Sequence, residues 1–516
     1  MPNRRAMVVG AAAALGVCAS ASAQIRVGCW NLTEYNGIPS RSAAFQTSIF
    51  GTFEGRSFAP DVLIVQEIAS EAATITFTGL LNTAPGSPGD YAYATFVNGP
   101  DTDSACFYRT SKLSLLGTAV AVSGSSTVST RHVMRYHLRP VSYSSSASSF
   151  YLLSAHLKAG NSSTDRDRRA EEALLVRAHL DALPAGTRFI FGGDLNLYTH
   201  TEPAWGTLTA PGGVEGGRLY DPINRAGSWN LNASFAAVHT QSPTSAFGGM
   251  DDRFDFLLVS DSISQGQGLA YMGDRNVPYG SVWNDPVHSY RCWGNDGFSF
   301  NQSMRIANNT MVGPVVAQAL FDHFAGTSTA PHLPVFLDLQ VPARASVSTL
   351  TLDFGTVFQG AVAQLPLTVT NVANIALWSK DGTGAGIDAL TYTLSPSAGF
   401  TAPAGTFNEA ADPGAVGNVH QIGMLTAMLG PKSGTLTIAS DDPEAPTIIV
   451  TLLGNVITPF DFDVNDDGVV DIEDAYAWLV SPTDVTADGV IDGADLVELI
   501  AEIRRLEVQD MTSGRR

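Results

Sequence analysis

The chain has 516 residues, of which 44% are hydrophobic and 15% charged, and its formal net charge is −20. This length is too great for one hydrophobic core and predicts several domains, and the apolar fraction is too high for a disordered chain. Residues 24–340 hold 26 acidic and 20 basic residues (20 − 26 = −6), whereas residues 341–516 hold 23 and 7 (7 − 23 = −16). The N-terminal part therefore lacks the basic excess of a tight nucleic-acid binder, so a polyanion would depend on single arginines and a bound cation.

Residues 1–23 have the layout of a signal peptide. Two arginines precede the apolar run 7–17, and small residues at 21–23 close it. A run of this length is too short to span a membrane, so a membrane anchor is the weaker alternative. We expect cleavage before Gln24, no stable membrane insertion, and a secreted, extracellular protein, with the periplasm and the cell surface as alternatives.

Three cysteines follow the signal segment, which is too few for a disulfide framework. Cys29 stands in a strand-like segment, and we expect it to be a buried apolar residue. Cys106 and Cys292 could form a disulfide in an oxidising compartment, which the sequence alone does not decide.

Residues 24–342 alternate strand-like and helix-like segments, which predicts sheets covered by helices. The short apolar runs are 62–65, 151–153, 189–191 and 256–259. A helix is predicted over 165–183, with Asp165 at its start and Pro184 after its end. Its apolar face carries Ala173, Val176, Leu180 and Leu183. The stretch 261–330 is rich in Gly, Asn and Ser and is expected to form long loops.

Residues 343–457 change character. Segments such as 350–355, 365–370 and 447–453 have the alternation or the β-branched composition of strands, with Gly, Pro and Asn turns between them. This pattern predicts an all-β sandwich. The segment resembles the immunoglobulin-like domains of many secreted bacterial proteins, notably in its Asp-Phe-Gly (353–355) and Ser-Asp-Asp-Pro (440–443) stretches.

Residues 458–507 contain a tandem calcium-loop pattern, followed by a short tail over 508–516. Oxygen-bearing side chains at positions 1, 3, 5, 9 and 12 can surround one Ca²⁺, and Gly at position 6 makes the sharp turn. The first loop supplies Asp463, Asn465, Asp467, Asp471 and Asp474, and the second supplies Asp484, Thr486, Asp488, Asp492 and Asp495.

The repeat resembles a dockerin module, a small helical, EF-hand-like unit with Asp at position 12. That resemblance implies bound Ca²⁺ and a protein partner. However, positions 10 and 11 are Ile472-Glu473 in the first loop and Gly493-Ala494 in the second. The two loops are therefore not equivalent at the positions that read a partner, which argues against a cohesin as that partner.

Six short segments in the N-terminal part carry acidic, amide and imidazole groups beside strand-like runs. They are Cys29-Trp30-Asn31, Val65-Gln66-Glu67, Ser154-Ala155-His156, Gly193-Asp194-Leu195-Asn196, Arg253-Phe254-Asp255 and Pro331-His332-Leu333-Pro334. Carboxylate and amide oxygens suit a hard divalent cation, and an imidazole beside a carboxylate suits proton transfer. Together the six segments are typical of metal-dependent phosphoester chemistry.

In this order the segments resemble the endonuclease/exonuclease/phosphatase superfamily, the group of DNase I-like enzymes, over about residues 25–340. The matching stretches are VGCWNL, DVLIVQEI, LLSAHLKAG, FIFGGDLNLY, DRFDFLLVS and PHLPVFLDL. The resemblance implies an α/β (α+β) fold of two packed β-sheets flanked by helices. It also implies hydrolysis of phosphodiesters or phosphomonoesters with a divalent ion, Mg²⁺ or Mn²⁺.

Hydrolysis of a phosphate ester needs an aligned water and positive charge at the phosphorus. Glu67 is the expected carboxylate ligand of Mg²⁺. Asn31 is expected to orient Glu67, to join it as a ligand, or to contact the bound phosphate. Asp194 is the candidate that orients or deprotonates water. Asn196, two residues on, is expected to donate to the phosphate.

His332 is expected to contact a phosphoryl oxygen or to act as the acid–base group, with Asp255 fixing its tautomer and raising its pKa. His156 matches the superfamily's second active-site position, near the leaving group. Arg131, in TRHVMRY, fits an arginine that contacts phosphate. Lys158 is a phosphate-binding candidate, with an ordinary solvated lysine as the alternative.

The chain departs from the superfamily at one position. Where members have Ser-Asp-His before the last strand, this sequence has Ala330-Pro331-His332. The missing Asp would contribute to a metal position, and Asp296 and Asp322 are candidate replacements. Either the enzyme works with one metal held chiefly by Glu67, or its activity is weakened and a binding role remains.

Three functions follow from these patterns. The first is a secreted, metal-dependent nuclease of the DNase I type, acting on extracellular nucleic acid. The second keeps the fold but changes the substrate, as in a sphingomyelinase-like enzyme or an inositol-phosphate phosphatase. The third is a catalytically weakened adhesion or binding protein. The motifs alone leave open DNA or RNA, endo or exo cleavage, and the oligomeric state.

Overall fold

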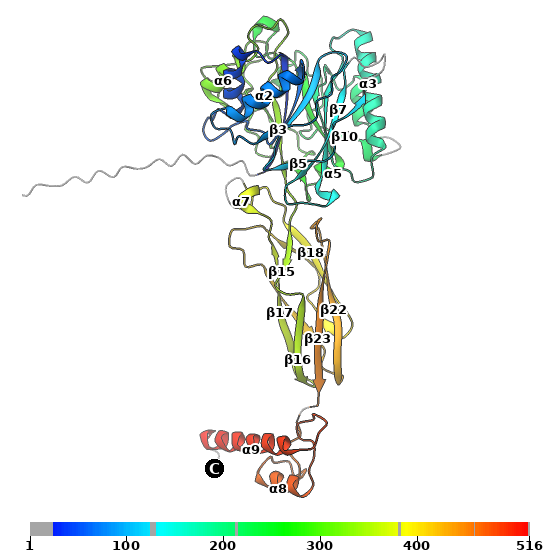
Figure 1. Cartoon of the computed structure of the whole chain (residues 1–516), viewed down its shortest axis with the longest axis vertical. Coiled ribbons are helices and arrows are strands. Elements are labelled where there is room, and N and C mark those ends of the chain that lie inside the picture. Colours follow the sequence, from blue (N-terminus) through cyan, green and yellow to red (C-terminus); the bar gives the residue numbers. More distant parts are fainter. Residues whose placement is uncertain (1–23, 124–130, 212–214, 380–382, 459, 514–516) are drawn as a thin grey trace, which may run out of the picture.

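A computed structural model describes residues 24–123, 131–211, 215–379, 383–458 and 460–513. The predicted signal peptide lies outside these ranges. Figure 1 shows an N-terminal part (residues 24–342) of sheets and helices, an elongated middle part (343–457) and a small helical C-terminal part (460–513). None of the helices in the described ranges combines the length and the apolar composition that a membrane crossing requires.

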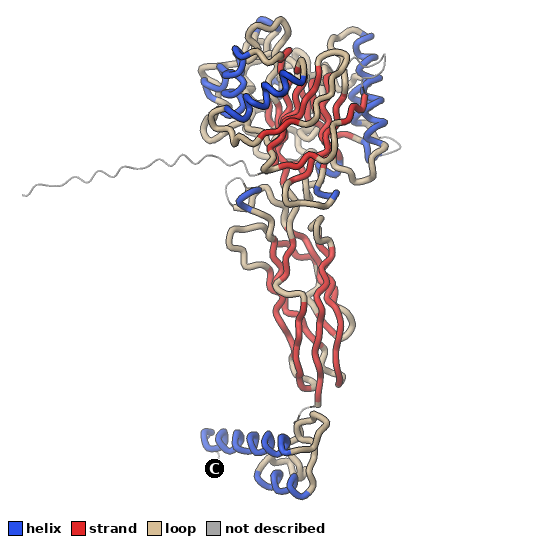
Figure 2. Tube along the Cα trace, viewed as in Figure 1, coloured by secondary structure: helices blue, strands red, loops and turns tan. Residues whose placement is uncertain are grey.

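Two seven-stranded sheets make up the N-terminal part (Figure 2). The first sheet contains β1 (Ile25–Tyr35), β2 (Val62–Ile68), β3 (Tyr91–Tyr93), β4 (Asp103–Arg109), β12 (Ala270–Tyr271), β13 (Arg291–Cys292) and β14 (Val335–Gln340). The second contains β5 (Leu113–Leu115), β6 (Val120–Ser123), β7 (Val133–Pro140), β8 (Phe150–His156), β9 (Phe189–Asp194), β10 (Leu219–Tyr220) and β11 (Asp255–Ser260). This mixed arrangement of sheets and helices agrees with the predicted α/β class.

The same strand pattern occurs once in each sheet. In the first sheet β1 and β2 are parallel, and β14 runs antiparallel beside β1. In the second sheet β8 and β9 are parallel, and β11 runs antiparallel beside β9. In each sheet the carboxyl ends of the parallel pair and the amino end of the antiparallel strand therefore share one edge.

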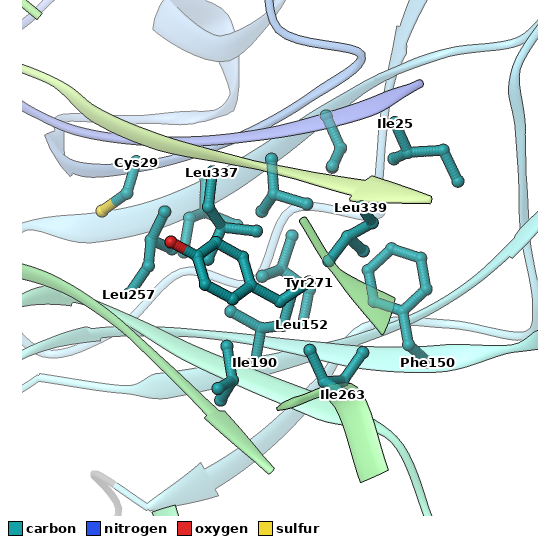
Figure 3. Packing of buried hydrophobic residues seen from close by; sticks show 14 of the residues in the cluster. Ile25, Cys29, Phe150, Leu152, Ile190, Leu257, Ile263, Tyr271, Leu337 and Leu339 are labelled. Atoms are coloured by element: carbon teal, nitrogen blue, oxygen red, sulfur yellow. The ribbon is translucent and has the colours of Figure 1, made fainter. Parts of the chain in front are cut away.

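An apolar layer holds the two sheets together. Figure 3 shows Cys29 and Leu337 from the first sheet facing Leu152, Ile190 and Leu257 from the second. All five side chains are buried, as strand alternation predicts for residues two apart on one face. Burying one such aliphatic side chain contributes about 1.5–3 kcal/mol, so this layer resists any change in the spacing of the sheets.

Helices cover the outer faces of the two sheets. α1 (Ser42–Phe50), α2 (Glu71–Thr83) and α6 (Gly313–Asp322) pack on the first sheet, and α3 (Ser163–Asp181) and α4 (Pro203–Thr209) on the second. The short α5 (Asp261–Ser264) follows β11 directly. The stretch 261–330 is mainly loop, as expected, but it also contains α6, which the sequence analysis missed.

The predicted helix over 165–183 is α3, displaced toward the N-terminus by two residues. Ser162, not Asp165, is the N-cap: its Oγ accepts from the backbone N–H of Asp165, and the Asp165 carboxylate accepts in return from the Ser162 N–H. This reciprocal capping box satisfies two otherwise unpaired N–H groups. The predicted apolar face packs on the second sheet through buried Ala173, Val176 and Leu180.

The structure answers the question that the sequence left open, because Cys106 and Cys292 do not form a disulfide. Both are free and buried, as is Cys29. The strand register places both cysteines in one row of paired residues across the first sheet. The order along this row is Cys292, Val335, Cys29, Ile64 and Cys106. Four strand spacings separate them, about 19 Å, whereas a disulfide needs Cα atoms within about 7 Å.

Two further sheets pack face to face in the middle part around one apolar cluster. One contains β15 (Ala345–Val347), β17 (Ala363–Asn371), β19 (Phe400–Thr401) and β21 (Asn418–Met424). The other contains β16 (Thr351–Phe358), β18 (Leu390–Pro396), β20 (Thr406–Glu409), β22 (Gly430–Ser440) and β23 (Thr447–Ile457).

A short helix, α7 (Ile375–Trp378), anchors the middle part to the N-terminal part. Trp378 is buried in the same apolar cluster as the interior of the two N-terminal sheets. Beside it, the Glu444 carboxylate accepts from the backbone N–H groups of Ser144 and Ser145 at 2.8 and 2.7 Å. The buried Trp378 side chain and the two hydrogen bonds to the Glu444 carboxylate thus join the two parts.

The C-terminal part consists of two loops, each followed by a helix. α8 (Ile472–Val480) follows the first loop and α9 (Gly493–Ser513) the second. Trp478, Val485, Leu499 and Ile503 form the small apolar core between them.

Gly193, next to Asp194 on β9, gives a direct test of this fold. Its φ is +144°, and a Cβ there would lie 1.8 Å from the carbonyl oxygen of Ala155 on β8. We expect Gly193→Ala to destabilise the N-terminal part by roughly 2–6 kcal/mol, through backbone strain and overpacking. Denaturant unfolding followed by tryptophan fluorescence would measure this change.

The matched control is Gly206→Ala. Gly206 lies inside α4 with open space around the added Cβ, so this variant should gain roughly 0.5–1 kcal/mol. Equal free energies of unfolding for the two variants would contradict the close approach of the β8 backbone to Gly193 on β9.

Candidate active site

The strand ends bring the predicted side chains to one place. Asn31 stands near the end of β1, Glu67 near the end of β2, His156 at the end of β8 and Asp194 at the end of β9. Asp255 is the first residue of β11, and His332 precedes β14. Because the shared edges of the two sheets lie together, groups from six distant segments meet in one cluster.

Asn31 links the two halves of the cluster. Its Nδ2 donates to Glu67 Oε1 at 3.0 Å and to Asp194 Oδ2 at 3.1 Å, while its Oδ1 accepts from the backbone N–H of Thr33 at 2.9 Å. The amide group that faces the carboxylates is thus the donor. In this orientation Asn31 positions Glu67 and Asp194, and direct coordination of a metal by its oxygen would require the amide to rotate.

Two residues of the cluster have left-handed backbone conformations. The φ of Glu67 is +57° and that of Asn196 is +50°. Such conformations cost roughly 1–3 kcal/mol for a residue with a side chain, and they persist where the surrounding structure imposes them. Both occur where a strand ends at the site, and they direct these side chains away from regular strand alternation.

His332 and Asp255 form the expected pair. His332 Nδ1 lies 2.7 Å from Asp255 Oδ2, and both side chains are buried. Burial lowers the pKa of His332, but the carboxylates of Asp255 and Asp194 outweigh this effect and raise it to about 9. The imidazole is therefore a cation at neutral pH, and its Nε2 lies 3.6 Å from Asp194 Oδ2.

Asp194 and His156 have pKa values that burial dominates. Burial, together with the negative charges of Asp255 and Glu67, raises the pKa of Asp194 to about 7, although His332 opposes the change. Burial and the cations Arg131 and His332 hold the pKa of His156 well below 6.5. Asp194, with a pKa near neutral pH, thus lies beside the neutral imidazole of His156 and the imidazolium of His332. Such a combination of groups is suited to proton transfer.

Glu67, His156 and Asp194 form a group of side chains that could together hold a metal ion. One potential ligand atom from each lies within 4.8 Å of the others. His156 Nδ1 is buried and has no hydrogen-bond partner among the described residues. Two carboxylates and a free imidazole nitrogen are a donor set that fits a divalent cation.

The remaining predicted residues, Arg131, Asn196 and Lys158, differ in their relation to this cluster. Arg131 Nη2 pairs with Asp101 Oδ2 at 3.1 Å, and its charge reaches His156. Asn196 Nδ2 donates to the carbonyl of Leu157 at 3.2 Å, which leaves its second amide hydrogen for a phosphate oxygen. Lys158 instead turns to the start of α3, where its Nζ lies 3.0 Å from Asp165.

Neither proposed replacement for the missing carboxylate reaches the site. Asp296 binds Arg305, and Asp322 accepts from Gln318 on the same helix. Gln241, which no motif marks, also belongs to the site, because its side-chain amide nitrogen lies 2.7 Å from His332 Nε2. A protonated His332 donates from Nε2, so this contact requires the Gln241 amide to turn its oxygen toward the ring.

Asp252 was not predicted either. Its carboxylate accepts from Asn230, and burial raises its pKa to about 6, with His332 close enough to lower it. Gln241 and Asp252 lie in irregular segments without a motif, and only the bridges from Gln241 to Asp252 and to His332 reveal their place.

A cavity of about 640 Å³ lies apart from this cluster. It opens on the outer face of the first sheet, where Arg26 and Asp338 form a buried ion pair at 2.7 Å. The candidate catalytic side chains do not line it.

The two loops of the C-terminal part repeat the same geometry. The carboxylates at position 1, Asp463 and Asp484, accept from backbone N–H groups at positions 5 and 6. The position-12 carboxylates, Asp474 and Asp495, are 0% exposed and accept from N–H groups at positions 3 and 9. Acidic side chains thus organise both loops, with a donor set of oxygens that fits Ca²⁺.

No protein-family model and no curated protein matches the chain. Similar solved structures include an endonuclease/exonuclease/phosphatase family protein from Bacteroides thetaiotaomicron (16% identity, 61% of this chain and 94% of that chain, TM-score 0.36). A second is a mannosyl-6-phosphatase from the same organism (18% identity, 61% of this chain and 99% of that chain, TM-score 0.36). A third is D. rerio TDP2 complexed with single-strand DNA product (12% identity, 62% of this chain and 99% of that chain, TM-score 0.37).

Replacing Asp255 by Asn tests the electrostatics of the cluster. The change removes the nearest negative charge from His332, so the imidazolium loses stabilisation and the pKa of His332 should fall from about 9 to 6.5 or below. NMR titration of histidine-labelled full chain in EDTA would follow it, with His332→Gln identifying the signal. Asp296→Asn, which alters a buried carboxylate paired with Arg305, should leave this pKa in place. An unchanged titration in Asp255→Asn would contradict the assigned pair.

Proposed function

We propose that the N-terminal part is a divalent-metal-dependent phosphoester hydrolase. The observation that carries this proposal is the meeting of Glu67, His156 and Asp194 from two sheets within 4.8 Å. Asn31 and the Asp255–His332 pair surround that group. Three carboxylates crowd one imidazolium, so a cation would balance the charge of the cluster.

Glu67, Asp194 and His156 would hold the ion, and Mg²⁺ or Mn²⁺ suits their oxygen-rich donor set. When bound, such an ion supplies positive charge that stabilises the phosphorus transition state. The residues around it supply the remaining chemistry.

Asp194, through the carboxylate oxygen that does not hold the ion, orients a water molecule and accepts its proton as the water oxygen bonds to phosphorus. The bond from phosphorus to the leaving oxygen breaks, and that oxygen takes a proton from solvent. His332, kept protonated by Asp255, donates from Nε2 to a phosphoryl oxygen, where negative charge develops. Asn196 donates its second amide hydrogen to the same group. Asn31 holds Glu67 and Asp194 at their separation, so that the water and the phosphorus meet in one geometry.

Within this reaction class, a nuclease acting on extracellular DNA or RNA is our first candidate. It rests on the DNase I-like motifs and on the expected export of the chain, since nucleic acid is an abundant phosphodiester outside cells. The net charge of −6 over residues 24–340 and the pairing of Arg131 with Asp101 favour a smaller phosphoester as the second candidate. A sphingomyelin or a sugar phosphate belongs to that class.

The first test is hydrolysis by the full chain. Supercoiled DNA, RNA, sphingomyelin vesicles and glucose 6-phosphate would be assayed with Mg²⁺, Mn²⁺ or EDTA. We expect Asp194→Ala and His332→Ala each to lower kcat by about 10²–10⁴-fold, because each removes a proton-transfer or charge-stabilising group. EDTA should abolish turnover.

The control is Asp167→Ala, which removes an exposed carboxylate of α3 and should keep wild-type rates. Wild-type rates in both active-site variants would refute the assignment. Failure to hydrolyse any of these substrates with any metal would favour the alternative of a binding protein weakened at Pro331.

We also propose that the chain is exported and that its C-terminal part binds two Ca²⁺ ions. Export rests on residues 1–23, with the cell surface or periplasm as alternative destinations. Calcium binding rests on the two matched loops with oxygen side chains at positions 1, 3, 5, 9 and 12. Two ions would offset about four negative charges in the most acidic region of the chain. A protein partner for this dockerin-like and immunoglobulin-like tail is the accompanying hypothesis.

Limited proteolysis tests the calcium proposal. Ca²⁺ should slow cleavage within residues 460–513 by at least about tenfold, since ligands that bind only the folded state stabilise it. The double variant Asp463→Ala/Asp484→Ala should lose this protection, whereas Glu498→Ala, which changes an exposed carboxylate of α9, should keep it. Identical protease patterns with Ca²⁺ and with EDTA would refute calcium binding.

A further inference from the structure

A buried hydrogen bond between two side chains joins the two sheets within the apolar layer, close in sequence to the candidate active-site residues. Gln66 Nε2 donates to Ser154 Oγ at 2.9 Å, and both side chains are 0% exposed. Gln66 directly precedes Glu67 on β2, and Ser154 lies two residues before His156 on β8. The bond therefore connects the strand that carries Glu67 with the strand that carries His156.

The surroundings of this pair are almost entirely apolar. The other contact of the Gln66 amide is the thiol of Cys29, with Sγ 3.6 Å from Oε1, and Ser154 Oγ also lies 3.4 Å from the carbonyl oxygen of Val65. Ile64 and Leu152, on the same strands and two residues away, belong to the apolar cluster. A buried amide–hydroxyl bond adds little net stability over apolar groups of the same size. A contribution to stability therefore does not explain why a polar pair stands at this position in the apolar layer.

The backbone of β2 indicates what the pair does. Strand alternation puts Ile64 and Gln66 on the inner face and would turn Glu67 outward. Instead, Glu67 has a φ of +57°, and the pairing of β2 with β4 shifts register between Val65 and Ile68. Regular pairing therefore does not fix the Glu67 side chain. The Glu67 carboxylate instead accepts from Asn31 Nδ2 at 3.0 Å and from the backbone N–H of Glu34 at 2.9 Å, both on β1 of the same sheet. Gln66, the next residue, ties β2 to the second sheet.

We propose that Gln66 and Ser154 are a positioning pair that, together with Asn31, sets the separation of Glu67 from His156 and Asp194, and so the affinity of the site for a divalent cation. The inference rests on the metal-dependent function proposed above. The three ligand side chains come from different sheets, with Glu67 on one and His156 and Asp194 on the other. Partners that orient metal ligands typically change metal affinity or activity by about 10–100-fold when they are removed.

The test compares three variants of the full chain. Ser154→Ala leaves the Gln66 amide nitrogen with only the Cys29 sulfur, at 3.6 Å, as an acceptor. The double variant Gln66→Met/Ser154→Ala replaces both partners by apolar groups and should recover most of the lost stability without restoring the link. Ser48→Ala is the control, because Ser48 is buried on α1 and its Oγ has no hydrogen-bond partner among the described residues.

Mn²⁺ affinity is measured by calorimetry, with Glu67→Gln giving the heat from the C-terminal loops for subtraction. Unfolding midpoints and the kinetics with bis(p-nitrophenyl) phosphate are measured on the same samples. We expect Ser154→Ala and the double variant both to bind Mn²⁺ about 10–100-fold more weakly, with kcat reduced more than KM is raised. Ser48→Ala should match the wild type.

A purely structural role predicts a different result, in which the double variant recovers stability, Mn²⁺ affinity and kcat together. That recovery, or an Mn²⁺ affinity within twofold of wild type in both variants, overturns the proposal. If the wild type hydrolyses no phosphoester yet binds Mn²⁺ through Glu67, the proposed function fails while the positioning role is still decided by the affinities. If the wild type is active and the variants match it, only the positioning role fails.

Discussion

The spacing of the two N-terminal sheets is the constraint on which the site depends. Trp30 Nε1 donates to the backbone carbonyl of His332, 302 residues later in the chain, so the first and last segments of the site are fixed to one another. The apolar layer between the sheets excludes water and sets how far apart their edges stand. Protein interiors are packed as densely as organic crystals, so that separation does not drift. Side chains at both edges therefore meet to within hydrogen-bonding distance.

Local irregularity at those edges completes the geometry. In a regular strand, successive side chains point to opposite faces of the sheet. This alternation builds an apolar core on one face, but it does not bring neighbouring polar side chains together at one site. Left-handed conformations at Glu67 and Asn196, and the close approach that Gly193 permits between β9 and β8, break this regularity where the chemistry is placed. The regular parts of the same strands stabilise the fold and so offset the strain at their ends.

Charge is concentrated in the same place. Glu67, Asp194 and Asp255 bring three carboxylates to a buried region in which His332 is the cation directly paired with one of them. Burial favours the neutral form of an acid, and this is why the pKa of Asp194 rises to about 7. The same arrangement keeps His332 protonated. An acid and a base of suitable pKa thus arise from one electrostatic balance, to which a divalent cation would add the missing positive charge.

Much of the fold and of the site could be predicted from patterns along the chain. Apolar periodicity predicted the strands 62–65, 151–153, 189–191 and 256–259 and the helix α3, because burial of one face imposes a period that residues display along the chain. Short polar segments at strand ends predicted which groups would gather, including the pair of Asp255 and His332. The loop spacing over 463–495 predicted the repeated turns.

Other features could not be predicted, because they depend on which strands become neighbours when the chain folds. The four strand spacings between Cys106 and Cys292 exclude a disulfide that the sequence allowed. Lys158 turns to α3, and Gln241 comes to His332 from a segment without a motif. The bond between Gln66 and Ser154 joins residues 88 positions apart. No periodicity encodes such contacts, since they arise where two sheets pack and not within either strand.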